Sequence, residues 1–173
     1  MIQGFEADCC LKSMQILIDT REKKNAHIIS ALGERKCTFK PHKLDYGDYS
    51  CQYIDLQNTT ISFDYKAVIE RKASLDELAG NLTKDRARFD REFIRAHDAG
   101  TKVFLMIEGG SYDDIKNHKY RSQFSPKSYL NTLFSWQEKY NITISFVSKK
   151  FAGDYIYGTL FMALKNYLLN GGE

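Results

Sequence analysis

The chain has 173 residues, 43% hydrophobic and 13% aromatic, which is enough apolar material for one domain with its own core. With 25 lysines and arginines against 22 acidic residues the net charge is +3, and 27% charged residues with a mean hydropathy of −0.46 exclude a disordered chain. No apolar run approaches the ~18 residues of a membrane span, and so mild a positive charge does not by itself indicate nucleic acid as the partner.

The first half of the chain is predicted to hold an arm, a helix and four strands. Residues 1–13 show no clear periodicity and are expected to form a flexible arm ahead of a domain over residues 14–170. The apolar run 14–19 ends in an acid and is typical of a buried strand, and Asn25 can cap a helix that continues to residue 34. Three more strands are expected, the last two paired antiparallel, over residues 38–44, 48–54 and 60–71.

Helices and strands alternate in the second half. Leucines and phenylalanines recur at helical spacing over residues 74–97, with a predicted break near residues 81–84. Residues 102–108 form a continuous apolar run that predicts the central strand. A polar loop, a helix from Ser125-Pro126, a strand over 142–147 and a helix over 151–169 are expected to follow. This order predicts an α/β fold with a central mixed β-sheet flanked by helices.

The cysteines and histidines do not form a recognisable centre. Cys9, Cys10, Cys37 and Cys51 make no CxxC pair and lie at no zinc-ligand spacing from the four scattered histidines, which are expected to be surface or packing residues. No secretory signal is visible at the N-terminus, so we expect reduced thiols in a cytoplasm.

A group of charged residues lies at the predicted ends of neighbouring strands. Glu70 and Lys72 share one face of a strand while Arg71 takes the other, and Asp48 opens the adjacent strand, so its carboxylate can approach Glu70. Two such carboxylates repel each other unless a cation lies between them, and oxygen ligands alone favour Mg²⁺ or Mn²⁺. Lys72 beside such a metal can orient or help deprotonate an attacking water. These parts predict phosphodiester hydrolysis.

Three further acids have roles that spacing leaves open. Asp19 and Glu22, at the end of the first strand, can complete the metal shell or hold Lys72 or Arg71. Asp76 can cap the next helix, act as an outer carboxylate, or do both. In isolation a Glu-Arg-Lys triplet is more often a solvated charge cluster. Its position at a strand end favours a site, together with Gly47-Asp48 one strand earlier and Asp-Thr-Arg-Glu at the end of another strand.

The signature GD…ERKxxxD is present in Gly47-Asp48, Glu70-Arg71-Lys72 and Asp76. It resembles the signature of the XPF-type, or ERCC-family, nuclease domain, a group of structure-specific DNA endonucleases in the PD-(D/E)XK superfamily. The resemblance covers residues 14–169 and extends to the Asp-Thr-Arg-Glu of the first strand, to Arg88 and Phe89, and to Glu108.

This resemblance implies a restriction-endonuclease-like fold, Mg²⁺ or Mn²⁺, and cleavage of branched, flapped or junction DNA in replication, recombination or repair. It implies that Asp48 and Glu70 bind the metal, that Lys72 is the catalytic lysine, and that Arg71 and Asp76 support the site. Asp19 and Glu22 would be accessory acids that can join the metal. The alternative is a catalytically silent DNA-binding or scaffolding domain, of a kind known among relatives.

Enzymes of this family usually carry a C-terminal tandem helix-hairpin-helix module, for which no room is left before Glu173. We therefore expect a stand-alone, phage-type version whose DNA is gripped by the nuclease domain or by a DNA-targeting protein partner. Basic side chains and aromatics alternate in the loop 116–127, and DNA contacts are predicted for Arg88, Lys119, Arg121 and Lys127.

The basic loop 116–127 and the last helix can each be interpreted in two ways. The loop can equally be a solvated segment whose aromatics pack locally. The last helix carries more apolar residues than one face needs, which indicates core packing or an isologous homodimer through the C-terminal helices.

Overall fold

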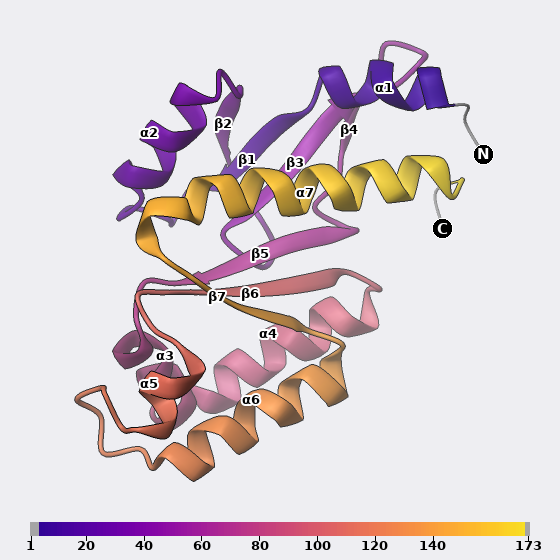
Figure 1. Cartoon of the computed structure of the whole chain (residues 1–173). Coiled ribbons are helices and arrows are strands. Elements are labelled where there is room, and N and C mark those ends of the chain that lie inside the picture. Colours follow the sequence, from indigo (N-terminus) through magenta and orange to yellow (C-terminus); the bar gives the residue numbers. More distant parts are fainter. Residues whose placement is uncertain (1–3, 172–173) are drawn as a thin grey trace.

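Residues 4–171 are described by a computed structural model, in which one mixed β-sheet is covered by helices on both faces (Figure 1). These residues contribute seven strands, namely β1 (Gln15–Asp19), β2 (Phe39–His42), β3 (Tyr49–Ile54), β4 (Thr60–Ser62), β5 (Ala67–Lys72), β6 (Lys102–Glu108) and β7 (Thr143–Val147). The strand order is β2-β1-β3-β5-β6-β7, and β4 pairs with β3 outside this path. The predicted central mixed sheet is therefore confirmed, with β5 and β6 in its interior.

The helices form two layers, one on each face of the sheet (Figure 1). One layer holds α1 (Gly4–Lys12), α2 (Ala26–Glu34) and α7 (Ala152–Leu169), the last preceded by a short 3₁₀ turn at Lys149–Phe151. The other layer holds α3 (Leu75–Thr83), α4 (Arg86–Asp98), α5 (Tyr112–Lys116) and α6 (Pro126–Tyr140). Each layer encloses a separate hydrophobic core against the sheet, because alternate residues of each strand point to opposite faces: Val68 packs in one core and Ile69 in the other.

The direction of the strands gathers their ends at one edge of the sheet. β3 runs antiparallel to β1 and β5, whereas β5, β6 and β7 are parallel to one another. The C-terminal ends of β1, β5 and β6 therefore meet at the same edge as the N-terminal end of β3. This edge, where Asp19, Asp48, Glu70 and Glu108 lie, is called the charged edge below.

The elements differ from the prediction in three places. The expected arm over residues 1–13 is a helix from Gly4 to Lys12, and residues 1–3 lie outside the described residues. The expected strand 60–71 is interrupted by a turn at residues 63–66, where the Lys66 N–H bonds to the Phe63 carbonyl at 3.0 Å. The polar loop after β6 contains the short helix α5. None of the helices in residues 4–171 combines the length and apolar character that a membrane crossing requires.

The α1 helix is held by tertiary packing rather than by its own periodicity. Ala7, Cys10 and Leu11 are buried in the core that also contains Ile156 and Leu160 of α7. We expect Leu11→Ala to lower the free energy of unfolding by about 2–4 kcal/mol, because it leaves a cavity under α1. Urea denaturation of this variant would measure the loss. The exposed Leu56 provides the matched control, and Leu56→Ala should change the free energy by less than ~0.5 kcal/mol; equal effects would contradict the packing of α1.

Candidate active site

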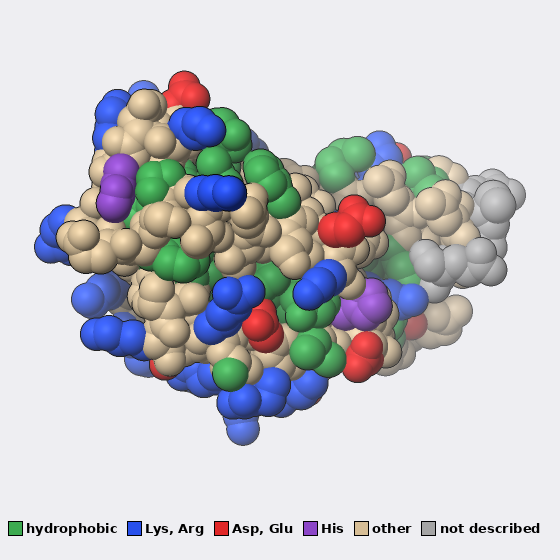
Figure 2. All heavy atoms as spheres, turned by 90° about the horizontal axis from the view of Figure 1, so that it is seen from below, with side chains coloured by type: hydrophobic (Ala, Val, Ile, Leu, Met, Phe, Trp, Pro, Cys, Tyr) green, Lys and Arg blue, Asp and Glu red, His purple; other side chains and the backbone are tan. Residues whose placement is uncertain are grey.

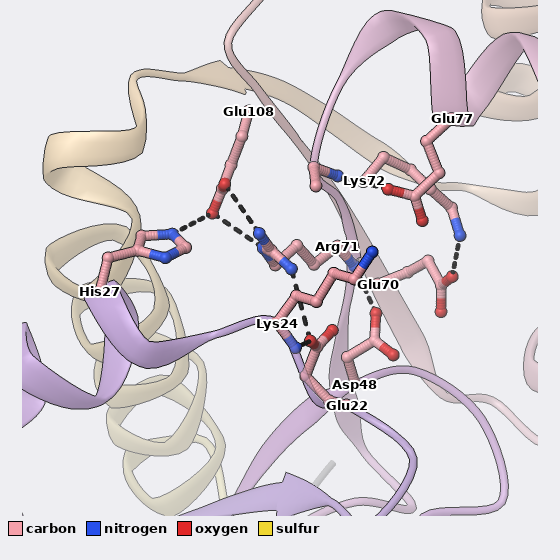
Figure 3. A network of polar contacts seen from close by, with 10 residues as sticks. Glu22, Lys24, His27, Asp48, Glu70, Arg71, Lys72, Glu77 and Glu108 are labelled. Carbon is pink, nitrogen blue, oxygen red and sulfur yellow. Dashed lines mark hydrogen bonds and ion pairs between the residues drawn. The ribbon is translucent and has the colours of Figure 1, made fainter.

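The predicted acids at the charged edge are brought together by the pairing of β3 with β5. Tyr49 lies opposite Ile69, so the residue before Tyr49 is level with the residue after Ile69. The backbone N–H of Asp48 donates to the Ile69 carbonyl at 2.8 Å, and the Asp48 carboxylate accepts from the backbone N–H of Arg71 at 2.7 Å. The carboxylates of Asp48 and Glu70 point into the same region (Figure 3). The structure thus places side by side the two residues that the sequence predicts as metal ligands.

Both carboxylates are harder to ionise than a free aspartate or glutamate. The pKa of Asp48 is raised well above its usual value, first by burial and then by the negative charge of Glu70. Burial also raises the pKa of Glu70, and the positive charge of Lys72 offsets only part of that effect. A pair of carboxylates held in this state is short of positive charge, which a divalent cation between them would supply.

Lys72 is fixed in position by an ion pair and an aromatic ring. Its Nζ lies 2.7 Å from Oε1 of Glu70 and 4.5 Å from the centroid of the Phe89 ring. Burial opposes its charged form, but Glu70 and Asp48 outweigh burial, so the pKa of Lys72 is raised and its ammonium stays protonated. With only 7% of Lys72 exposed, this ammonium is a fixed positive charge beside the two carboxylates.

Arg71 points to the opposite face, as the strand alternation predicts, and joins a second network (Figure 3). Its guanidinium binds Glu108 through two hydrogen bonds of 2.8 and 2.9 Å, and its Nη1 lies 3.4 Å from a Glu22 oxygen. His27 Nε2 lies 3.0 Å from Oε1 of Glu108. Because the Arg71 backbone also binds Asp48, this network connects the β1–α2 loop, β5 and β6 to the acid pair.

Two residues of this network were missed or left without a role by the sequence analysis. His27 is predicted there to be a surface or packing residue, yet it contacts a buried acid. Glu108 enters only through the family resemblance, although an acid that ends the central strand beside β5 is a signal for a partner of Arg71. The pairing itself depends on the parallel register, in which Arg71 lies opposite Met106 and Lys72 opposite Ile107.

Both carboxylate oxygens of Asp19 accept hydrogen bonds from other residues of the protein. Its Oδ2 accepts from the backbone N–H of Leu44 at 2.8 Å, and its Oδ1 accepts from the backbone N–H and Nε of Arg21 at 2.8 and 2.6 Å. Burial acts against the charge of Asp19, but these hydrogen bonds lower its pKa overall. Asp19 therefore holds the segment after β2 against the end of β1. One hypothesis from the sequence was that Asp19 holds Lys72 or Arg71, but its hydrogen-bond partners are Arg21 and Leu44.

Asp76 fastens a loop and does not cap α3. Its carboxylate accepts from the backbone N–H of Arg121 at 2.7 Å and from Arg121 Nε at 3.1 Å. The cap of α3 is Ser74, whose hydroxyl accepts from the Glu77 N–H at 3.1 Å, while the Glu77 carboxylate accepts from the backbone N–H of Ala73 at 2.9 Å. The capping role considered for Asp76 is thus wrong, and the Ser-x-x-Glu pattern is the signal that identifies Ser74.

Three of the four residues predicted to contact DNA form ion pairs on the protein surface. Arg88 lies 3.7 Å from Asp85, Lys119 lies 3.3 Å from Asp114, and Arg121 is bound to Asp76. Lys127 is exposed at the start of α6. Figure 2 shows the molecule from below, the side on which α4 and α6 lie, with Lys and Arg side chains gathered along the left and lower edges and others in the middle, among acidic and hydrophobic side chains.

The aromatics of the basic loop pack locally, which is the second of the two interpretations given above. The ring centroid of Tyr120 lies 5.2 Å from that of Tyr129, and the centroid of Phe124 lies 5.8 Å from it. The Tyr120 hydroxyl donates to the Phe124 carbonyl at 2.6 Å. These rings are engaged within the protein, so only the lysines and the arginine of the loop remain available for the predicted DNA contact.

The acid pair fits a magnesium-type ion. Within residues 4–171 no group of three or more histidine, cysteine or acidic side chains converges as a metal cage. The hydrogen bond to Arg71 uses Oδ2 of Asp48 and the ion pair with Lys72 uses Oε1 of Glu70, which leaves a second oxygen on each carboxylate. Mg²⁺ usually keeps several waters and binds through one or two carboxylates, so two carboxylates suit it and would not suit a structural zinc ion.

Gly47 shapes the approach of the chain to Asp48. Its φ of +75° lies in the left-handed region, and a Cβ built on it would lie 2.8 Å from Cβ of Val68. We expect Gly47→Ala to lower the free energy of unfolding by about 1–3 kcal/mol and to reduce any activity that depends on Asp48, because strand β3 must shift. Thermal denaturation checks the first expectation. Gly33→Ala is the control, since a Cβ there meets no atom within 4 Å; a Gly47→Ala variant as stable as this control would contradict the argument.

Comparisons with known proteins support the fold and identify the family. Two solved structures of XPF from Aeropyrum pernix are similar: one at 21% identity, with a TM-score of 0.64, over 86% of this chain and 61% of that chain, and one in complex with DNA at 19% identity, with a TM-score of 0.59, over 91% and 66%. The chain thus spans less than two thirds of the length of either structure. No curated protein sequence matches it. The matches confirm the predicted restriction-endonuclease-like fold.

The family model described as the ERCC4 domain matches residues 18–158, which is well over half of the chain. This match includes the charged edge with Asp48, Glu70 and Lys72, and it confirms the resemblance drawn from the GD…ERKxxxD signature. The chain therefore belongs to the ERCC4 domain family.

Proposed function

We propose that the chain is a metal-dependent DNA endonuclease that hydrolyses phosphodiester bonds in branched, flapped or junction DNA, with Mg²⁺ or Mn²⁺ as the cofactor. The observation that carries this proposal is the meeting of two carboxylates of raised pKa, half-buried Asp48 and buried Glu70, with a fixed lysine at one edge of an ERCC4-family sheet. Two neighbouring acids with raised pKa and a single lysine between them destabilise a fold, so their presence favours a functional role.

The residues of the site divide the work. Asp48 and Glu70 would hold the divalent cation, which when bound lowers the pKa of a water and polarises the phosphate. Because the raised pKa keeps Lys72 protonated, its ammonium would stabilise negative charge on the phosphate and orient the water rather than act as a base. Arg71 is a positioning residue, since its backbone N–H holds the Asp48 carboxylate. Glu22 lies close enough to Asp48 to raise its pKa and can join the metal through a water.

DNA would reach the charged edge across the surface that carries the four predicted DNA-contacting side chains. Arg88, Lys119, Arg121 and Lys127 are proposed to contact phosphates, which supply most of the affinity of proteins for DNA and make it salt-dependent. The ion pairs of Arg88 and Lys119 are exposed pairs that contribute little to stability, so both side chains can exchange an acid for a phosphate. Asp76 would support the site by holding Arg121 and its loop next to α3.

Cleavage assays test this proposal directly. We expect the protein to cut end-labelled flap, fork or four-way DNA in the presence of Mg²⁺ or Mn²⁺, to leave it intact in EDTA, and to cut linear duplex more slowly. Lys72→Ala should reduce the rate by about 10²–10⁴-fold. If the wild-type protein binds these DNAs and cuts none of them, the silent scaffolding domain becomes the better description.

A homodimer through the C-terminal helices is a second, separate part of the proposal. Ile156, Leu160 and Leu164 on the inner face of α7 are fully buried in the protein's own core, so core packing accounts for that face. Phe151 and Met162 remain about half exposed and would lie in the interface. Light scattering over a range of concentrations decides the question, because a monomer at every concentration would exclude the dimer.

A DNA-targeting protein partner is likewise proposed, and a pull-down with the natural host's proteins would test it.

A further inference from the structure

A groove of about 360 Å³ lies on the α1–α7 layer, between α1, the start of β2 and the middle of α7. Leu11 and Met14 line it from the core side and are almost fully buried. One wall is α1, which lies outside the residues 18–158 that match the family, and Phe161 of α7 also lies outside them. The groove is therefore built partly by segments that flank the residues matched by the family model.

The rim of the groove is positively charged. Lys12, Arg35 and Lys36 line it against a single acid, Asp8. Arg35 is bound to Asp154 through its Nε, whereas Lys12 and Lys36 are exposed and have no acidic partner within 4 Å among residues 4–171. Two free ammonium groups on a concave surface attract an anion more strongly than the same groups on a convex one.

Aromatic rings form the wall on the α7 side. Tyr157 and Phe161 lie one helical turn apart, with ring centroids 5.8 Å apart and an angle of 21° between the ring planes. The Arg35 guanidinium lies over the Tyr157 ring at 5.2 Å from its centroid and is held there by Asp154. Phe161 is half-buried, so part of its ring remains accessible from the groove. Flat rings beside ammonium groups are the combination that binds single-stranded nucleic acid.

Helix α2 connects this groove with the charged edge. Its first turn carries His27, which contacts Glu108 in the network of Figure 3, and Arg35 follows its last residue at the groove. Eight residues of helix span roughly 12 Å, which corresponds to about four stacked nucleotides at ~3.4 Å each. A strand that leaves the charged edge along α2 would therefore reach the groove within a few nucleotides.

We propose that this groove binds a single-stranded segment of the DNA substrate, with phosphates on Lys12 and Lys36 and a base stacked on Phe161. This inference rests on the proposed nuclease function. It adds a structural reason why the nuclease would prefer DNA that contains an unpaired strand.

The test measures binding separately from cleavage. Fluorescence anisotropy with a labelled dT₁₂ oligonucleotide in EDTA compares the wild-type protein with the double variant Lys12→Glu/Lys36→Glu. We expect the variant to bind at least about tenfold more weakly, with a salt slope reduced by about 1.4, because two phosphate contacts are lost. Lys84→Glu/Lys139→Glu changes the net charge equally at exposed positions of the other helix layer, and it should stay within about twofold of the wild type.

Cross-linking identifies the stacking partner without relying on charge. An oligonucleotide that contains 5-iodouracil should cross-link under ultraviolet light to the peptide that contains Phe161, and Phe161→Leu should abolish this product while the protein remains folded by circular dichroism. Unchanged binding by the Lys12→Glu/Lys36→Glu variant, or an equal loss in the control variant, would overturn the proposal. So would binding of a Glu-Tyr copolymer peptide, but not of dT₁₂, in the groove.

The two levels of the proposal fail in different ways. If the wild-type protein cuts branched DNA while the groove variant binds dT₁₂ normally, only the groove is excluded. If the protein cuts no DNA and the Lys12→Glu/Lys36→Glu variant still binds dT₁₂ more weakly than the wild type, the groove binds single strands in a protein that is not a nuclease.

Discussion

Asp48→Asn is expected to abolish measurable DNA cleavage, by about 10³-fold or more, and at the same time to stabilise the metal-free protein. The asparagine keeps the shape of the side chain and a carbonyl oxygen that can accept the 2.7 Å hydrogen bond from the Arg71 N–H. It removes the charge that burial and Glu70 oppose. Loss of activity together with gained stability distinguishes a functional acid from a structural one.

The pH dependence follows from the sign of the shift. The folded-state pKa of Asp48 is raised above its usual 3.8, so the stability associated with its protonated form is complete below pH 3.8 and is lost as the pH rises through the folded-state pKa. The advantage of Asp48→Asn should therefore be absent near pH 3 and should grow to roughly 1 kcal/mol or more at high pH. Thermal and urea denaturation in EDTA from pH 3 to pH 8 would measure it.

Metal and a matched variant complete this experiment. Added Mg²⁺ should raise the melting temperature of the wild-type protein, because it binds the folded state, and should leave that of Asp48→Asn unchanged. Asp45→Asn, at an exposed position three residues earlier, should change neither activity nor stability appreciably. A destabilised Asp48→Asn variant that still cuts DNA would refute the assignment of Asp48 as a metal ligand.

Glu108→Ala is expected to lower the free energy of unfolding by about 3–5 kcal/mol, the largest stability effect at the charged edge. Glu108 and Arg71 are both nearly fully buried, and two hydrogen bonds of 2.8 and 2.9 Å join them. Removal of the carboxylate leaves the guanidinium buried with Glu22 at 3.4 Å as its remaining ionic partner. A guanidinium that moves in response would also displace the backbone that holds Asp48.

The pairing of Glu108 with Arg71 also predicts how the stability of the protein changes at low pH. Burial opposes the charge of Glu108, but the hydrogen bonds from Arg71 and His27 outweigh it and lower its pKa below the usual 4.5. Its contribution to stability is therefore present above pH 4.5 and is lost as the pH falls through the lower folded-state value. Glu108→Gln, which keeps the shape, should remove this acid-dependent part of the stability curve. Glu138→Gln, at an exposed position of α6, is the control, and equal pH profiles for Glu108→Gln and the wild-type protein would contradict the pairing.

The Glu70-Arg71-Lys72 triplet illustrates what a short-range pattern can predict. The alternation of side chains along β5 is enough to place Glu70 and Lys72 on one face and Arg71 on the other, because it depends only on the geometry of a strand. The break between α3 and α4, and the start of α6 at Ser125-Pro126, also follow from local residues. The proximity of Asp48 to Glu70 needed one assumption more, namely that two strands close in sequence are neighbours in the sheet.

Other features depend on contacts between distant segments. The α1 helix has only Ala7, Cys10 and Leu11 buried, and their partners on α7 lie about 150 residues later. Asp19 looked available at a strand end, but its environment is set by Leu44, 25 residues away. No local pattern reveals such partners, because the same acid at a strand end can be open or fully hydrogen-bonded.

The sequence by itself determined most of the strands and helices, though not α1, α5 or the turn between β4 and β5. It also determined the family signature and the face on which each residue of β5 lies, since these follow from periodicity and spacing within a few residues. Only the tertiary structure decided that Arg71 belongs with Glu108 and His27, that Asp19 accepts hydrogen bonds from Leu44 and Arg21, and that α1 and α7 enclose a basic groove. These depend on the order and register of the strands and on helix packing, which are selected by the burial of the whole core and not by any one segment. The mild net charge of +3 thus combines acids gathered at the charged edge with cations on the surface, a separation that composition cannot express.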